Sequence, residues 1–479
     1  MTRVAPLALL ALPLLAQTPE ARPEPPLTFD GGVSLVARQE LYNRMPTYGG
    51  MAVMENLFRF REWIWGEARW RVDYALNIKF ANEWQKFIAH RDQRSSYTWP
   101  DELVLAGLYF EAKNLFDDSL DLRVGRQDLM GFGSWRIFGD GTPGDGFRTF
   151  YTDALLATWR ITPEHTLRLF GIVQEPENFL ALGTPHGTKY PERQLNQREV
   201  AAEGSLESAV GLYHTTTLVD PAAPLDLYAI WKREEDYRYR NATRPGRSIW
   251  TQGVRFRPGL GQKIAAEIEA AFQTGRTDDG RDICAWMFYS QAKHTFPRAP
   301  FLPVQPWLGG GFFALSGDSD PNQGTVTDWN PLWGRHPYFS ELLLWGQINY
   351  VNGMGNWCNL LYPSLQGGLS FRPDEGTEGV FQAAPGRMHF ANAHRIFFHT
   401  GPLFTLVPNS ELHANGGEGQ YYGWLGVAQY NFMLVKNLFG SRGDLGGLIR
   451  GEFLVPGEYT GLEGEKPAYF LRLQLDFVY

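Results

Sequence analysis

The chain has 479 residues, of which 43% are hydrophobic and 20% charged, and its formal net charge is −8. This length would accommodate two or three soluble domains, but after the N-terminal segment no stretch of the sequence approaches the ~20 apolar residues of a membrane helix. Spanning of a membrane by helices is therefore excluded. The 52 glycines and the 14% of aromatic residues favour many strands, tight turns and aromatic girdles.

The N-terminus predicts an exported protein. Arg3 is followed by the apolar run VAPLALLALPLLA, which is too short to span a bilayer and ends at the small residue Ala16. We therefore expect a cleaved signal peptide over residues 1–16, in preference to a disordered apolar tail, and a Pro-rich segment over residues 17–28. No cysteine lies near the expected cleavage site, so a lipoprotein anchor is not indicated. Residues 29–479 show no sharp shift in composition and are expected to form one domain.

Apolar and polar residues alternate in several long segments, as in strands with one apolar face. The clearest segment is Ala68 to Phe80, in which the even-numbered residues are apolar and the odd-numbered ones mostly polar. Such a run is too long for an ordinary globular strand but fits a tilted strand that crosses a membrane. Ile264 to Thr274 and Thr166 to Val173 repeat the pattern.

Further strands are expected between clusters of Gly, Pro, Asp and Asn. They lie near residues 29–41, 54–65, 102–113, 119–128, 148–160, 198–217, 225–234, 248–257, 283–295, 303–315, 338–350, 359–372, 392–406, 420–435 and 446–455. The spacing predicts about 18 strands, an even number, as expected when both chain ends lie in the periplasm.

The last segment, YFLRLQLDFVY, carries the most information. Tyr469, Leu471, Leu473, Leu475, Phe477 and Tyr479 share one parity, while Arg472, Gln474 and Asp476 share the other. A strand with an apolar face, a polar face and a terminal aromatic residue resembles the closing strand of bacterial outer-membrane barrels, in which the apolar face meets lipid and the polar face lines the lumen. We therefore predict an all-β fold, a transmembrane antiparallel β-barrel, in the outer membrane of a Gram-negative-type bacterium.

Two longer segments resemble a known family. Residues 122–159 contain GRQ, GDG and RTFYTDALLATW elements, and residues 310–345 contain GDSDPNQG, NPLW and FSELLLW. In this order the elements resemble the alginate export (AlgE-like) family of outer-membrane porins, with the last element expected to be a strand. The resemblance implies a monomeric barrel of 18 strands in outer-membrane lipid, whose narrow, arginine-rich lumen passes an acidic polysaccharide. Periplasmic export components would be further partners, and nucleic acid would not.

Seven arginines are predicted to line the pore: Arg59, Arg61, Arg69, Arg71, Arg126, Arg148 and Arg168. Five of them oppose apolar neighbours in the alternating pattern, and Arg148 belongs to the family's RTFYTD element. For Arg126 the two arguments conflict, because alternation places it on the lipid side while the GRQ element points to it. A β-bulge at Gly125 would bring Arg126 inward.

Arginine suits the expected cargo. A guanidinium group can hold a carboxylate in bidentate fashion, and several weak sites in series allow release as well as capture. The alternative role for the same arginines is pairing with acidic groups across a lumen that is polar in any such barrel.

The main hypothesis is therefore a passive channel for an anionic polysaccharide or oligosaccharide and not an enzyme. The first alternative is a general porin for other small anionic or neutral solutes. An outer-membrane hydrolase is a weaker alternative, since the sequence contains no GxSxG element. A soluble glycan-binding β-protein is disfavoured by the long strands with lipid-like faces.

No cofactor is expected. The Asp- and Gly-rich runs at residues 139–146 and 316–324 could bind Ca²⁺, but turn chemistry explains them without a metal. Cys284 and Cys358 could form one disulfide in an oxidising compartment, but their spacing does not decide it.

Overall fold

The structure is a computed structural model. It describes residues 27–479 except 45, 48–49, 52–54, 72, 90–96, 99–102, 130–135, 139–150, 175–180, 183–200, 204–205, 219, 240–241, 261–262, 299–303, 321–323, 335–338, 346–357, 372–393, 408–416 and 440–441. The predicted signal peptide and nearly all of the Pro-rich segment lie outside these residues. Among the described helices, none has the length and apolar character needed to cross a membrane.

Eighteen long strands form one closed sheet in the described part of the chain. They are β1 (Thr28–Asn43), β4 (Glu55–Trp70), β5 (Tyr74–Ala89), β7 (Leu103–Asn114), β8 (Leu120–Gln127), β9 (Thr152–Thr162), β10 (His165–Gln174), β13 (Glu207–Thr216), β14 (Leu225–Glu234), β17 (Arg247–Phe256), β19 (Ile264–Thr277), β20 (Asp282–Thr295), β21 (Val304–Leu315), β22 (Leu360–Phe371), β23 (Arg395–Phe404), β24 (Tyr421–Val435), β25 (Asp444–Pro456) and β26 (Ala468–Val478).

The remaining elements are short. They are the strands β2 (Pro46–Thr47), β3 (Gly50–Met51), β6 (Tyr97–Thr98), β11 (Ala181–Leu182), β12 (Ala201–Glu203), β15 (Tyr237–Tyr239), β16 (Ala242–Arg244) and β18 (Gly259–Leu260), the helices α1 (Leu115–Asp118) and α2 (Glu341–Trp345), and the 3₁₀ turn η4 (Glu458–Thr460).

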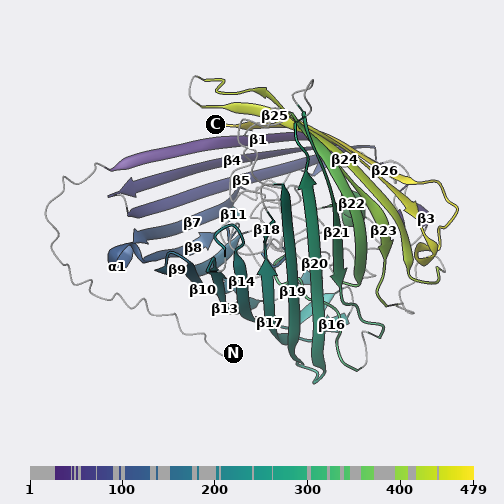
Figure 1. The fold of residues 1–479 in the computed structure, drawn as a ribbon, viewed down its shortest axis with the longest axis horizontal. Coiled ribbons are helices and arrows are strands. Elements are labelled where there is room, and N and C mark those ends of the chain that lie inside the picture. Colours follow the sequence, from purple (N-terminus) through teal and green to yellow (C-terminus); the bar gives the residue numbers. More distant parts are fainter. Residues whose placement is uncertain are drawn as a thin grey trace.

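The long strands follow one another around the barrel in chain order, and each pairs antiparallel with its neighbours (Figure 1). The ring closes where β1 pairs with β26, for example Ser34 with Val478. Backbone hydrogen bonds from Val33 N–H to Tyr479 O (3.2 Å) and from Tyr479 N–H to Val33 O (2.8 Å) extend this pairing. Closure leaves no edge strand to pair with another molecule, and it confirms the predicted all-β antiparallel barrel of about 18 strands.

The two faces of the barrel differ as the last segment predicts. In β26, the side chains of Arg472, Gln474 and Asp476 are buried toward the interior, while Leu471 and Leu473 are 51% and 50% exposed on the outside. Exposed large apolar side chains recur on most of the other long strands. An apolar exterior around a closed barrel is the surface of a protein that crosses an outer membrane.

The prediction of one strand over Ala68 to Phe80 is wrong. β4 ends at Trp70, a turn includes Arg71 and Asp73, and β5 begins at Tyr74, which pairs with Trp70. The faces of the second half were nevertheless predicted correctly, because Leu76 lies outside with 47% of its surface exposed.

The prediction of a strand near residues 338–350 is also wrong within the described residues. Glu341–Trp345 form the short helix α2, and residues 346–350 lie outside the described part. The expected strand at 198–217 contributes only Glu207–Thr216 to the barrel, while Ala201–Glu203 belong to a separate small sheet.

Connections of different length lie at the two ends of the barrel. The connections at the end that holds Thr28 and Tyr479 include short turns, such as those after β4 and β9, and the opposite end carries the long β8–β9 connection (residues 128–151) and β21–β22 connection (residues 316–359). In outer-membrane barrels the short turns face the periplasm and the long loops face outside. Both long connections contain buried residues, including Arg136 and Trp329, which pack with interior side chains of the strands.

Candidate channel lumen

Five buried arginines lie on four neighbouring strands and face the lumen. They are Arg450 on β25, Arg472 on β26, Arg38 on β1, and Arg59 and Arg61 on β4, and we call them the arginine wall. The strand register places Arg450 opposite Arg472 and Arg38 opposite Arg59. The alternation of β-strands turns all five to the same side, because paired residues share a face.

Glu40 is the central carboxylate of the arginine wall. One of its oxygens accepts a hydrogen bond from Arg472 Nε at 2.7 Å and lies 3.5 Å from Arg38 Nη1, and the other oxygen lies 3.1 Å from Arg59 Nε. Three guanidinium groups therefore share one carboxylate. This arrangement keeps positive charges together in a buried site where opposite charge is essential.

The β21–β22 connection is attached to the arginine wall through α2. Glu452 accepts hydrogen bonds from Ser340 Oγ (2.8 Å) and from the backbone N–H groups of Glu341 (2.9 Å) and Leu342 (3.2 Å). Arg472 Nη1 lies 2.9 Å from Glu341. A carboxylate at the first turn of a helix satisfies N–H groups that have no partner within the helix.

The same connection is also attached to the strands β14 and β19. Gln273 donates to Asn330 O (2.7 Å) and accepts from Asn330 N–H (2.8 Å), and the Asn330 amide donates to Glu234 (3.0 Å). Lys232 Nζ donates to Leu332 O at 3.0 Å. The connection therefore spans the lumen between two parts of the barrel wall.

The β8–β9 connection enters the lumen at Arg136. Its fully buried guanidinium group donates from Nε to Glu269 at 2.6 Å, pairs with Glu267 and lies 3.8 Å from the ring centre of Tyr289. The next residues contact the other connection: Phe138 stacks on Trp333 with ring centres 5.5 Å apart, and Trp333 N–H donates to Ile137 O. Two long connections thus meet inside the barrel and narrow it.

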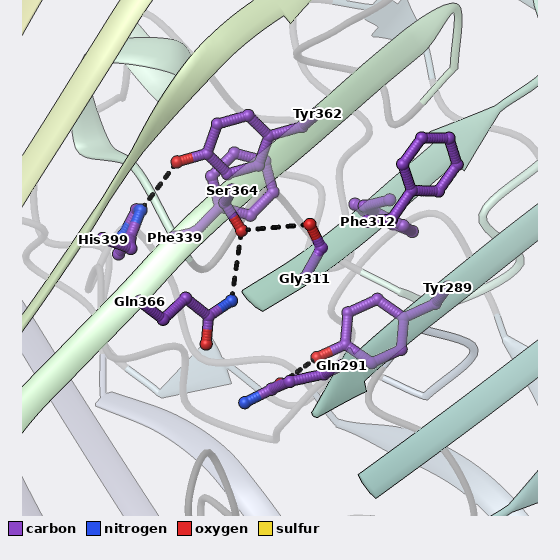
Figure 2. A pocket seen from close by; sticks show the side chains of 10 residues that line it. Tyr289, Gln291, Gly311, Phe312, Phe339, Tyr362, Ser364, Gln366 and His399 are labelled. Carbon is purple, nitrogen blue, oxygen red and sulfur yellow. Dashed lines mark hydrogen bonds between the residues drawn. The ribbon is translucent and has the colours of Figure 1, made fainter. Parts of the chain in front are cut away.

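A small pocket lies behind Phe339 of the β21–β22 connection (Figure 2). Phe339 stacks on Tyr362 with ring centres 4.7 Å apart, and Tyr362 Oη lies 2.8 Å from His399 Nδ1. The cavity volume is about 40 Å³, which admits a few water molecules but no sugar ring. The pocket is part of the lumen wall and not a cargo site.

The structure places Arg59, Arg61, Arg69 and Arg168 on the lumen face, as predicted. Arg69 Nε lies 2.9 Å from Glu67, and Arg168 Nη1 donates to Thr215 Oγ1 at 3.2 Å. Only the first two belong to the arginine wall, so the set is not brought together at one place. Contact of these side chains with a solute stays a prediction.

Arg126 is buried, but not through the expected bulge. The pairing of β8 with β7 and β9 shows no shift of register, so the predicted bulge is wrong. Gly125 instead has φ +119°, and a Cβ there would lie 2.4 Å from Leu108 O. Arg126 Nε lies 2.9 Å from Asp153, and its guanidinium stacks 3.7 Å from the ring centre of Tyr151.

The other two predicted arginines do not line the described lumen. Arg71 is exposed in the β4–β5 turn with φ 50°, so the prediction for it is wrong. Arg148 lies outside the described residues. The structure adds Arg38, Arg450, Arg472 and Arg136. Alternation could have found the first three, whereas Arg136 lies outside any alternating strand.

The described residues contain no group of three or more His, Cys, Asp or Glu that could hold a metal ion. Of the two candidate calcium runs, residues 139–146 and 321–323 lie outside the described part. Cys284 and Cys358 are not joined by a disulfide in the described structure.

No family model and no curated protein matches the sequence. Solved structures match over nearly the whole chain. Pseudomonas aeruginosa OccK5 (OpdH) aligns with a TM-score of 0.54 at 11% identity, covering 94% of this chain and 98% of that chain. Acinetobacter baumannii OccAB2 gives a TM-score of 0.53 at 11% identity with the same coverage, and Pseudomonas aeruginosa OpdO gives 0.51 at 13% identity, covering 94% and 97%.

The chain shares the fold of these bacterial proteins. At such low identity the likeness concerns the fold and not the cargo. None of the three names refers to alginate export, so the resemblance of residues 122–159 and 310–345 to the AlgE-like family enters only the proposal below.

Proposed function

We propose that the protein is a passive outer-membrane channel for small anionic or neutral solutes, with no catalytic step, and that the arginine wall favours carboxylates. The observation that carries this proposal is the gathering of five buried arginines on β25, β26, β1 and β4, beside the place where the β21–β22 connection crosses the lumen.

Charge supports a preference for anions. Guanidinium groups present planar pairs of donors that match a carboxylate, and charges lining a narrow path between low-dielectric walls raise the local concentration of counter-ions. Arg38, Arg59 and Arg472 already share Glu40. A solute carboxylate would therefore exchange with an existing partner, which favours the weak, multiple binding that conduction requires.

The two inward connections favour small solutes over a polymer. The β21–β22 connection is attached at Glu452 on one side and at Gln273 and Glu234 on the other, and it contacts the β8–β9 connection through Trp333. An acidic polysaccharide is the second candidate cargo, and the sequence resemblance to the AlgE-like family is the observation that favours it.

Conductance in planar bilayers tests the proposal. The mature chain should show a reversal potential in a KCl gradient that indicates anion preference, and the double change Arg59→Ala with Arg61→Ala should reduce that preference. Arg276→Ala is the matched control, because Arg276 lies at a strand end with 70% of its side chain exposed. A wild-type channel that prefers cations, or equal effects of the double change and the control, would overturn the proposal.

The same measurement separates the two cargoes. Glucuronate and longer uronate oligomers are added in turn, and the concentration that blocks half of the current is compared. Similar block per carboxylate supports a small-solute channel. Block that tightens steeply with oligomer length, with passage of the oligomer to the other chamber, supports polymer transport.

A further inference from the structure

The hydrogen-bonded ladder of the barrel is interrupted between β22 and β23. Leu361 pairs with Phe404 and Leu365 pairs with Thr400, but no pairs occur between these two positions. The register there places Pro363 opposite Pro402. Neither proline has an N–H group to donate, so the two strands are held at this level by their other neighbours, β21 and β24.

A depression of about 660 Å³ lies on the outer face over this interruption. Part of its lining follows one row of the strand register: Ala266 pairs with Ala292, Ala292 with Gly310, Gly310 with Leu365, and Leu365 with Thr400. Three of these five residues are alanine or glycine, so the outer surface is low across three adjacent strands. Pro363, Pro402 and Trp424 line the depression further along.

The barrel wall is thin at this place. Gln291, Gly311 and Ser364 line both the outer depression and the interior pocket behind Phe339, which Figure 2 shows. The interior pocket keeps a volume of about 40 Å³. Side chains from the lumen therefore do not fill the space from within, and the depression can be filled only from outside.

The surroundings decide what fills the depression. Apolar side chains that frame it, such as Leu365 and Trp424, are exposed on the face that meets lipid. The nearby polar groups are satisfied within the protein, because Trp424 Nε1 donates to Thr400 Oγ1 (2.7 Å) and Thr400 Oγ1 donates to Leu425 O (2.8 Å). An empty apolar hollow forfeits dispersion contacts, and the molecules that can supply them there are flexible hydrocarbon chains.

We propose that this depression, bounded by Ala266, Ala292, Gly310, Pro363 and Trp424, is a binding site for one hydrocarbon chain of an outer-membrane lipid. A chain seated there covers the interruption between β22 and β23 and seals the thinnest part of the wall against the lumen. The site is independent of the solute that the channel conducts.

Gly310→Leu is the direct test, because it fills the depression. A Cβ at Gly310 would lie no closer than 3.4 Å to a neighbour, at Ser364 O, so the side chain can project outward without a backbone clash. Gly171→Leu is the matched control: Gly171 lies between exposed Leu169 and Val173 on β10, and a Cβ there meets nothing within 4 Å. Ala292→Leu is a second filling variant if Gly310→Leu does not fold.

Native mass spectrometry of the full mature chain provides the measurement. Each variant is reconstituted in vesicles of phosphatidylethanolamine and phosphatidylglycerol, extracted in mild detergent, and checked for its anomalous migration before boiling. Wild type and Gly171→Leu should retain one lipid per chain at collision energies that strip the others, and the retained fraction should fall at least tenfold in the filling variants.

Three results would overturn the proposal. These are the absence of a tightly retained lipid in wild type, its equal retention in the filling variants, and an oligomer of the chain that the filling variants dissociate. The last result would assign the depression to contact with a second copy.

Discussion

Replacing Arg136 by alanine tests whether one buried guanidinium group holds the β8–β9 connection inside the lumen. The change leaves Glu269, which is fully buried, without its closest cation, while Tyr228 Oη still donates to it at 2.9 Å. Removing one partner of a buried ion pair costs about 3 to 5 kcal/mol. Since ~1.4 kcal/mol is tenfold in an equilibrium, the ratio of docked to undocked connection should fall on the order of 10²- to 10³-fold.

Hydrogen–deuterium exchange on the protein in detergent measures this ratio, through the peptides that contain Arg136 to Phe138. Exchange there should rise in Arg136→Ala, and single-channel conductance should increase because the connection leaves the lumen. Arg160→Ala is the matched control: Arg160 also forms two short contacts with one carboxylate, Asp121 (2.6 and 2.8 Å), but 38% of its side chain is exposed. An exposed pair is worth about 0 to 1 kcal/mol. Unchanged exchange in Arg136→Ala, or an equal rise in the control, would refute the reasoning.

Three further predictions concern the lipid face, the lumen and pH. Leu473→Arg, at the middle of β26, should lower the free energy of unfolding by about 2 to 4 kcal/mol in denaturant titrations, whereas Leu76→Arg, close to the β4–β5 turn, should cost about 0 to 1 kcal/mol; equal costs would contradict the assigned depths. Arg59→Lys with Arg61→Lys keeps the charge but loses the planar pair of donors, so chloride conductance should persist while block by uronate weakens; unchanged block would argue against recognition of carboxylates by geometry. In the β21–β22 connection, burial and then the neighbouring Asp318 raise the pKa of Asp328 to about 7, against the opposite effects of Arg247 and Cys358. A carboxyl group whose pKa is raised on folding stabilises the fold fully below its unfolded pKa of ~3.9 and loses that contribution as the pH rises to about 7. Exchange at residues 324–334, corrected for its intrinsic pH dependence, should therefore increase between pH 5 and 7 in wild type and not in Asp328→Asn, and identical profiles would exclude Asp328 as the cause.

The barrel could be predicted from the sequence because lipid and lumen impose opposite polarity on alternate residues. β14, predicted at residues 225–234, is observed at Leu225–Glu234, and the parity of the last strand is correct at every buried polar residue. Alternation of this kind is a local signal, so it does not depend on knowing which strands pair.

The β4–β5 turn escaped prediction because it preserves the alternation. Trp70 and Tyr74 pair across the turn and both carry even numbers, so the apolar positions continue through it without a break. Arg71 adopts a left-handed backbone conformation, where glycine or asparagine would have signalled a turn. The expected strand at residues 338–350 failed for another reason. Leu342 and Leu343 are apolar because they are buried inside the barrel, and a sequence does not distinguish that environment from lipid.

The lumen was predicted in part. Arg59 and Arg61 followed from alternation on one strand, and Arg38 and Arg472 carry the same signal. Arg136 does not, because its partners Glu267 and Glu269 are separated from it by 131 and 133 positions in the chain. Only the closed fold brings these charges together.

The pairing across the β4–β5 turn also decides what the turn tolerates. In an antiparallel ladder, the two residues of a pair point to the same face whatever the number of residues between them, so extra residues beside Arg71 would leave every lipid-facing and lumen-facing side chain of β4 and β5 in place. Exposed tips of this kind accept insertions. A peptide epitope placed there would therefore mark one side of the membrane, and its accessibility to an antibody in intact cells would report the orientation of the barrel.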